Sequence, residues 1–318
     1  MCGDVVTQEL VKVTVGIPLY NAKVTVADAI RSVIAQTFQD WEIVVADDGS
    51  TDESQALIRT IGDRRVRFVH DGAHSGIASR LNQIAQTAHG DYLARMDADD
   101  LMHPDRLCKQ VEALEADPTL DVIGTATYTM DAAGVVNGVR GLARADMSPR
   151  EVVARGLFIH PTVTGRTAWF RSNPYDERFV RAEDHELWCR TASASRFGVV
   201  PEPLYFYREG GTGALAKYVQ SCRTDRAIFR LYGPAAAGRA WTARHVATSH
   251  LKAAAYRLAT WTGQEASILA RRNQPLTEAN RADAERALAV IRATHIPGLD
   301  DQGEPRERTG DSLHAERP

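Results

Sequence analysis

The chain has few cysteines, no long apolar run and no excess of positive charge, and each absence excludes a class of protein. Only four of its 318 residues are cysteines, and none forms a Cys-x-x-Cys pair, so neither a zinc site nor a disulfide framework is expected. No apolar stretch is long enough to span a bilayer. A net charge of −3 at pH 7 argues against a nucleic-acid partner.

The amino-terminal residues, MCGDVVTQEL, contain no basic segment followed by an apolar one, as a secretory signal would. We therefore expect a cytoplasmic protein. Hydrophobic residues make up 44% of the chain, which at this length is enough for one large domain or two smaller ones.

Strand-like and helix-like segments alternate through the first third of the chain. Expected strands cover 11–17, 41–47, 66–70 and 91–96, and the helices that follow them cover about 26–36, 52–61, 77–87 and 104–116. This alternation predicts an α/β fold with a parallel, doubly wound sheet. Ligands of such sheets bind at the carboxyl ends of the strands.

Polar clusters follow three of these strands: PLYN (18–21), DDGSTD (47–52) and DADD (97–100). The last cluster places Asp97, Asp99 and Asp100 together, where they repel one another unless a cation lies between them. Capping of the next helix would explain one aspartate but not three. Paired carboxylates at a strand end are typical of a site for a divalent metal, Mg²⁺ or Mn²⁺, that also holds a substrate phosphate.

Four segments together identify a family resemblance: VTVGIPLYNA, QTFQDWEIVVADDGSTDES, GIASRLNQIAQTAHGDYLARMDADD and RAEDHELWCR. In order and spacing they resemble the family 2 glycosyltransferases, over about residues 10–210. The resemblance implies a GT-A (Rossmann-like) fold for a catalytic domain at 10–214. It also implies an inverting, metal-dependent enzyme that uses a nucleotide-sugar donor.

Carried onto this sequence, the resemblance places Pro18, Tyr20 and Asn21 around the nucleotide. Asp48 would accept a hydrogen bond from the base. A carboxylate there requires a ring N–H, which uracil, thymine and guanine have and cytosine lacks, so a UDP-sugar is the expected donor, ahead of dTDP- and GDP-sugars. The alternative for Asp48 is a turn residue before Gly49.

The same resemblance makes Asp99 the direct metal ligand and places Asp97 nearer the ribose or a metal-bound water. Asp184 would be the general base that takes the proton from the acceptor hydroxyl. Glu183 would position the acceptor or share the proton, and His185 is a third candidate. The alternative is that this acidic pair only favours a helix start.

Three further residues fit the family less closely. His160, in FIHPTVTGR, is placed near the acceptor or diphosphate, with a purely structural role as the alternative. Arg208 would meet the diphosphate, and the glycines within 210–213 would let a loop close over the donor. Many relatives carry Arg-Asn in the helix after the third strand, where this chain has Leu-Asn, so Arg80 one place earlier is a candidate for that base or phosphate contact.

The carboxyl-terminal part, 215–297, has long helical patterns. Residues 217–272 contain ten Lys or Arg and two Asp or Glu, a net charge of +8, which leaves −11 for the rest. This asymmetry predicts contact with an anionic acceptor or with a membrane surface. At a membrane surface, a helix would be anchored by Trp241, Tyr256 and Trp261, and the protein would lie at the inner face of the membrane. Packing on the acidic catalytic domain or a homodimer contact are the alternatives. Residues 1–9 are expected to be flexible and 298–318 disordered.

Two other functions stay open. A nucleotidyltransferase would use a similar nucleotide pocket, but PLYNAKV lacks its Gly-rich phosphate loop. A non-catalytic relative that binds a sugar nucleotide or a glycan is the second, although Asp97, Asp99 and Asp184 are intact. The acceptor is not specified by the sequence: a glycan, a lipid-linked sugar, a protein or a small natural product would all fit.

Overall fold

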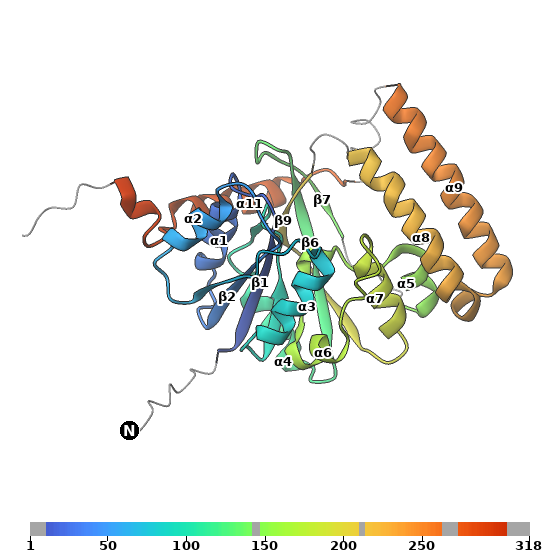
Figure 1. Ribbon diagram of the computed structural model, residues 1–318, viewed down its shortest axis with the longest axis horizontal. Helices are drawn as coiled ribbons and strands as arrows, with labels where there is room; N and C mark the ends of the chain where they lie inside the picture. Colours follow the sequence, from blue (N-terminus) through green and yellow to red (C-terminus); the bar gives the residue numbers. More distant parts are fainter. Residues whose placement is uncertain (1–10, 142–146, 210–213, 263–272, 304–318) are drawn as a thin grey trace, which may run out of the picture.

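The computed structural model describes residues 11–141, 147–209, 214–262 and 273–303 (Figure 1). The strands are β1 (Val13–Leu19), β2 (Trp41–Asp47), β3 (Val66–His70), β4 (Tyr92–Arg95), β5 (Leu101–Met102), β6 (Val122–Met130), β7 (Val136–Arg140), β8 (Thr164–Arg166) and β9 (Phe197–Arg208). The expected termini 1–9 and 304–318 and the glycines of 210–213 lie outside the described residues. Residues 300–303 of the expected carboxyl-terminal tail form a short 3-10 helix, η2 (Asp300–Gly303).

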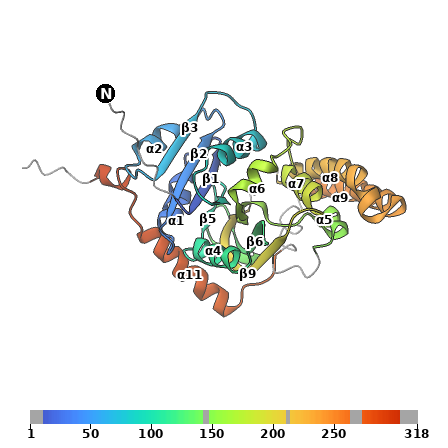
Figure 2. The same cartoon turned by 90° about the horizontal axis from the view of Figure 1, so that it is seen from below.

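Helices cover both faces of the sheet and extend from one end of it (Figures 1 and 2). The helices are α1 (Val26–Ile34), α2 (Ser54–Thr60), α3 (Ile77–Thr87), α4 (Arg106–Ala116), α5 (Pro149–Arg155), α6 (Thr167–Ser172), α7 (Glu183–Thr191), α8 (Ala214–Ala237), α9 (Arg239–Trp261) and α11 (Glu278–Ala293). A 3-10 turn, η1 (His160–Thr162), precedes β8.

The sheet has the order β3-β2-β1-β4-β8-β6-β9-β5, and β7 pairs with β6. The strands β3, β2, β1 and β4 are parallel, as the sequence predicts. Beyond β4 the sheet is mixed, because β8 runs antiparallel to both β4 and β6. The expectation of a doubly wound parallel sheet therefore holds only for the first half.

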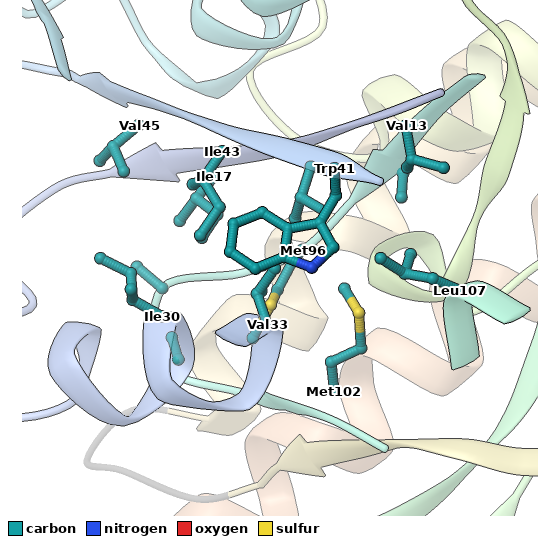
Figure 3. Close-up of a cluster of buried hydrophobic side chains, with 14 of the residues drawn as sticks. Val13, Ile17, Ile30, Val33, Trp41, Ile43, Val45, Met96, Met102 and Leu107 are labelled. Carbon is teal, nitrogen blue, oxygen red and sulfur yellow. The ribbon is translucent and has the colours of Figure 1, made fainter. Parts of the chain in front are cut away.

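In the parallel half, β1, β2 and β4 are buried almost throughout, whereas the edge strand β3 is only partly buried. All seven residues of β2, WEIVVAD, are buried, which fits the nearly continuous apolar runs of parallel strands. Figure 3 shows Trp41 at the centre of this core, between Ile17 of β1, Ile30 and Val33 of α1, and Met96 beyond β4. This rigid block fixes the strand ends from which the polar loops emerge.

The carboxyl-terminal helices lie at two different ends of the molecule. The helices α8 and α9 pack side by side beyond α5 and α7, whereas α11 lies on the far side of the sheet, beside α1 (Figure 1). Leu288 and Ile291 of α11 are buried in a cluster with Tyr128 and Phe206. None of the helices in the described ranges is both long and apolar enough to cross a membrane.

Candidate active site

Two cavities meet at the carboxyl ends of β1, β2 and β4. The first, of about 280 Å³, is lined mainly by the expected donor residues, namely Pro18, Tyr20, Asn21, Asp48, Arg80, Asp97 and Asp99. The second, of about 540 Å³, contains Glu183, Asp184 and His160 in its wall. Asp97 and Ile77 line both cavities, so the DADD loop forms the boundary between them.

Asn21 joins the loops that follow β1 and β2. Its backbone has φ 49°, a left-handed conformation that asparagine tolerates better than most residues. The side-chain oxygen accepts a hydrogen bond of 2.8 Å from the Thr51 amide, and the Asn21 amide donates to Ser50 Oγ at 2.9 Å. Asn21 thus holds the PLYN loop against DDGSTD at the edge of the first cavity.

The Asp48 carboxylate lies in the first cavity and is almost fully engaged by protein. Its Oδ1 accepts from the Ser75 amide at 2.7 Å, from the Gly76 amide at 3.0 Å and from Arg80 Nε at 3.0 Å. Its Oδ2 accepts from the Gly76 amide at 3.1 Å and lies 3.0 Å from His74 Nδ1. His74 Nδ1 also lies 2.9 Å from the Asp48 backbone carbonyl, so Oδ2 is the less occupied of the two carboxylate oxygens.

Arg80 differs from its predicted role. The guanidinium has five N–H donors, and all are used within the protein. Besides Asp48, they bind Asp71 at 2.7 and 2.8 Å, Gln83 at 2.9 Å and the Ala73 carbonyl at 2.6 Å. Although Arg80 lines the cavity, this arrangement favours a role in holding Asp48 and the 71–76 loop, in place of the expected base or phosphate contact.

Tyr20 and His74 form an aromatic pair beside Asp48. Their ring centroids are 4.6 Å apart, and the Tyr20 side chain remains half exposed, with 51% accessibility. An exposed ring next to a hydrogen-bond acceptor is suited to stacking on a planar base. His74 was not predicted from the sequence, because the loop after β3 carries no motif.

Asp97 is held by a buried arginine that the sequence analysis also missed. Arg95 Nη1 and Nη2 lie 3.0 and 2.7 Å from the two oxygens of Asp97, a bidentate pair. Arg95 is 5% exposed, and its Nε has no hydrogen-bond partner among the described residues. Burial opposes the charged form, but the nearby Asp97 outweighs it, so the pKa of Arg95 is raised. The sequence did contain a signal for this role: Arg95 is a charged residue within a strand that is otherwise apolar, directly before Met96.

The carboxylates of Asp97, Asp99 and Asp100 have ligand atoms within 4.8 Å of one another. Burial and the charge on Asp97 raise the pKa of Asp99, and the same causes, with Asp99 added, raise that of Asp100 well above its ordinary value. Asp100 Oδ1 accepts from the Arg208 amide at 2.7 Å, whereas its buried Oδ2 has no partner among the described residues. Hard oxygen ligands with this excess of negative charge fit a divalent cation.

Arg208 fastens the end of β9 to this loop. Its Nε donates to the Asp99 carbonyl at 2.8 Å, and its Nη1 donates to the carbonyls of Asp131 and Ala132 at 3.3 and 3.0 Å. These bonds place the guanidinium beside the acidic cluster, but they direct it to backbone oxygens. The predicted diphosphate contact stays a prediction.

The second cavity receives Glu183 and Asp184 from the first turn of α7, as the sequence predicts. The residue before them, Ala182, has φ 57°, a left-handed conformation that is uncommon for alanine and that occurs often near functional sites. Asp184 is partly exposed, and within the described ranges its carboxylate has no hydrogen bond or ion pair. Its carboxylate lines the second cavity.

His160 and Glu183 form a buried pair next to Asp184. Burial and the charge of Arg95 lower the pKa of His160 to about 3, while burial raises the pKa of Glu183. The ring lies 2.9 Å from the Tyr175 hydroxyl through Nε2 and 3.5 Å from Glu183 through Nδ1. Tyr175, which the sequence analysis did not single out, thus orients His160 in the wall of the second cavity.

His185 faces away from both cavities, which does not favour its predicted contact with acceptor or diphosphate. Its Nε2 lies 3.1 Å from the carbonyls of Val152 and Val153 in α5, and its Nδ1 lies 3.4 Å from Asp225 of α8. Burial alone would lower its pKa, but hydrogen bonds with Asp225 and Cys189 raise it to about 10. A charged His185 ties α7 to α5 and α8.

Sequence comparisons find relatives over this part of the chain. The putative glycosyltransferase EpsE of Bacillus subtilis is 33% identical over 207 residues, which cover 62% of this chain and 73% of EpsE. An uncharacterized glycosyltransferase of Rickettsia felis is 30% identical over 204 residues, but the match spans only 34% of that longer protein and 63% of this chain.

Solved structures share the fold at low sequence identity. A mannosyltransferase, PcManGT from Pyrobaculum calidifontis, in complex with GDP-Man and Mn²⁺, aligns with a TM-score of 0.57 and 18% identity over 92% of this chain and 88% of its own. S. aureus TarS 1–349 in complex with UDP-GlcNAc aligns with a TM-score of 0.56 and 17% identity over 89% and 82%. The fold of this chain is thus the GT-A fold with additional carboxyl-terminal helices.

Residues 14–179, which carry the first cavity and the whole DADD loop, match the family described as Glycosyl transferase family 2. This match covers more than half of the chain, and it agrees with the relatives and with the fold. The chain belongs to glycosyl transferase family 2.

Proposed function

We propose that this protein transfers a sugar from a UDP-sugar to a hydroxyl group of an acceptor, with inversion at the anomeric carbon. The observation that carries the proposal is the position of Asp97 between two cavities, one with the features of a nucleotide pocket and one lined by Asp184 and Glu183. Residues 10–214 would form the catalytic domain.

The first cavity would hold the nucleotide diphosphate. Tyr20 would stack on the base, and Asp48 Oδ2, the less occupied oxygen of that carboxylate, would accept its ring N–H. Both UDP and GDP satisfy this requirement. TarS binds UDP-GlcNAc and PcManGT binds GDP-Man, so these two structures favour neither uracil nor guanine as the base. The choice of uracil is therefore the first part of the proposal to test.

A divalent metal, Mn²⁺ or Mg²⁺, fits the acidic cluster. Both oxygens of Asp97 already accept from Arg95, whereas the Asp99 carboxylate receives no bond from another described side chain, so Asp99 would be the direct ligand and Asp97 would lie nearer the ribose. When bound, the metal would offset the charge of the leaving diphosphate. PcManGT binds Mn²⁺ together with its donor.

Asp184 would act as the general base from the second cavity. Inversion in one displacement requires the acceptor oxygen to attack from the face opposite the diphosphate, with a base on that side. Asp184 and the DADD loop line the same cavity, and no described residue competes for the Asp184 carboxylate. Glu183, with its raised pKa and its contact with His160, would position the acceptor.

The direct test combines binding and turnover. Calorimetric titration with UDP, GDP, dTDP and CDP, each with Mn²⁺ and again with a chelator, should give metal-dependent binding of UDP. Asp99→Ala should weaken that binding. Asp184→Asn should bind UDP as the unchanged protein does, but should lose release of UDP from the sugar donor, with water as the acceptor.

A non-catalytic relative that binds a sugar nucleotide would give a different pattern. It would bind UDP with metal, show no turnover of any UDP-sugar, and be indifferent to Asp184→Asn. Binding of none of the four nucleotides by folded protein would contradict the donor pocket itself.

A further inference from the structure

The helix α9 has an inverted distribution of side chains. The buried residues of α9 are all small: Thr242, Ser249, Ala253 and Ala259. The large apolar residues Leu251 and Leu258 are instead exposed, at 71% and 58%. Surface helices of water-soluble domains normally turn their apolar stripe inward.

The exposed apolar residues lie on one side of the helix. Leu251 and Leu258 are seven residues apart, which places them within roughly 20° of each other around the axis. Trp261 follows three residues later, roughly 60° further round, and is 84% exposed. We call Leu251, Leu258 and Trp261 the apolar strip. Grouped exposed residues of this size mark an interaction surface, whereas scattered ones do not.

Basic residues flank the apolar strip. Arg244 and Lys252 project on one side of it and Arg257 on the other, and all three are exposed. The helix contains no Asp or Glu. On the adjacent α8 the acidic Asp225 is turned toward His185, away from this face. Among the described residues of α8 and α9, the charged side chains beside the strip are therefore all basic.

The place of α9 in the fold leaves this face open. Figure 1 shows α9 as the outermost element at one end of the molecule, with α8 between it and the remaining domain. The two helices are joined by contacts that hold α9 in a fixed rotation, including a hydrogen bond of 3.0 Å from Ser249 to the Cys222 carbonyl and the Tyr218–Tyr256 ring pair at 5.8 Å. The strip cannot turn inward without breaking them.

We propose that the apolar strip of α9 docks this protein onto an anionic lipid surface. Leucine and tryptophan side chains would enter the boundary between headgroups and acyl chains, while Arg244, Lys252 and Arg257 would contact lipid phosphates. Tryptophan is the residue that prefers this boundary.

The charge argues against a second copy of the chain as the occupant. A two-fold dimer would place the same patch against itself. Arg244, Lys252 and Arg257 would then face their own copies with no acidic residue on α9 to pair with them. An anionic lipid surface supplies the missing negative charge.

The test is co-sedimentation of the full chain with phosphatidylcholine vesicles and with vesicles that contain about 30% phosphatidylglycerol, an anionic lipid. We expect binding to the anionic vesicles only. A Leu251→Ser/Leu258→Ser/Trp261→Ser variant should lower the affinity about tenfold or more. Arg244→Gln/Lys252→Gln/Arg257→Gln should remove the preference for anionic lipid, and binding of the unchanged protein should fall between about 50 mM and about 500 mM NaCl.

A matched control exposes similar apolar side chains elsewhere. Val135, in the turn before β7, and Val290, on α11, are 59% and 49% exposed. Val135→Ser/Val290→Ser should bind vesicles as the unchanged protein does. Brominated acyl chains should quench mainly Trp261 fluorescence, because Trp41, Trp169 and Trp188 are buried and the partly buried Trp241 stacks on His245 at 3.6 Å. That quenching should disappear in Trp261→Phe.

Three outcomes would overturn the proposal. Equal binding to neutral vesicles would remove the role of the basic residues. Vesicle binding that is unaffected by the apolar-strip variant would place the contact elsewhere. Absence of vesicle binding, together with a dimer that light scattering detects and the same variant dissolves, would identify a second copy as the occupant.

Discussion

Arg95→Lys is the sharpest test of how the acidic cluster is organised. The substitution keeps a positive charge in the buried position beside Asp97 but removes the planar fork. A lysine ammonium is a point charge, and it cannot hold both carboxylate oxygens in one plane. Asp97 should then lose its fixed orientation between the two cavities.

The expected size follows from the contacts. Arg95 makes two charge-assisted hydrogen bonds to Asp97, at 2.7 and 3.0 Å, and the pair is shielded from water because Arg95 is only 5% exposed. Loss of one such bond costs about 2 kcal/mol, which lowers Tm by roughly 4 °C in a chain of this size. If about 1.4 kcal/mol of that appears in the donor complex, UDP affinity in Mn²⁺ falls about tenfold.

The control is a second bidentate pair with the same chemistry at the surface. Arg178 Nε lies 2.9 and 3.1 Å from the two oxygens of Asp176, but the arginine side chain is 86% exposed. Arg178→Lys should change Tm by less than about 1 °C, because exposed pairs contribute little. Thermal melts and calorimetry of both variants decide the matter. Unchanged Tm and unchanged UDP affinity in Arg95→Lys would refute the positioning role of Arg95.

Three other outcomes are expected. The pKa of His185 is raised to about 10, so its contribution to stability is complete below about pH 6.5 and is lost as the pH rises through 10. The free energy of unfolding, measured in urea, should therefore fall by about 2 kcal/mol from pH 7 to 9. Asp225→Asn should make this fall smaller, and an equal fall in both proteins would contradict the prediction. Tyr20→Ala should weaken UDP binding about tenfold in calorimetry if the base stacks there, whereas unchanged affinity would exclude the stack. Gly76→Ala should lower UDP affinity and Tm, because Gly76 has φ 89° and its amide binds Asp48; a neutral substitution would show that this turn does not support the pocket.

The parallel half of the fold could be read from the sequence because its signals are local. Strands 41–47 and 66–70 and the helix 77–87 have the predicted limits, since continuous apolar runs and one clear helical period leave few alternatives. The mixed half carries weaker signals. All nine residues of β6, VIGTATYTM, are buried, but threonines alternate with apolar residues, and β8 is only three residues long.

The position of α11 could not be read from the sequence at all. The whole of 215–297 was treated as one helical region, because each part of it is rich in Ala and Arg. Only the fold shows that Ala287 and Leu288 complete a cluster with Met130, which lies more than 150 residues earlier in the chain. Such long-range packing has no local pattern.

The candidate site divides in the same way. Its acidic residues stand in contiguous motifs, so Asp97 and Asp184 could be proposed from the sequence, and each lines a cavity. The residues that contact Asp97, Asp48 and His160, namely Arg95, His74 and Tyr175, act through side-chain geometry across separate loops. That geometry appears only when the strands are aligned, and it also favours support of Asp48 as the role of Arg80.

The three carboxylates of DADD each have a different environment, and this difference decides how much of their mutual repulsion the protein offsets. Asp97 is neutralised by the Arg95 fork, and Asp100 is turned inward to the Arg208 amide, which joins β9 to the loop. Asp99 remains as the member with no bond from another described side chain, although burial and Asp97 disfavour its charge. Part of the repulsion therefore stays uncompensated by protein, and it includes the charge of Asp99, which lines the donor cavity. A cation that arrives with the nucleotide would relieve it at that point, so donor and metal would each favour binding of the other.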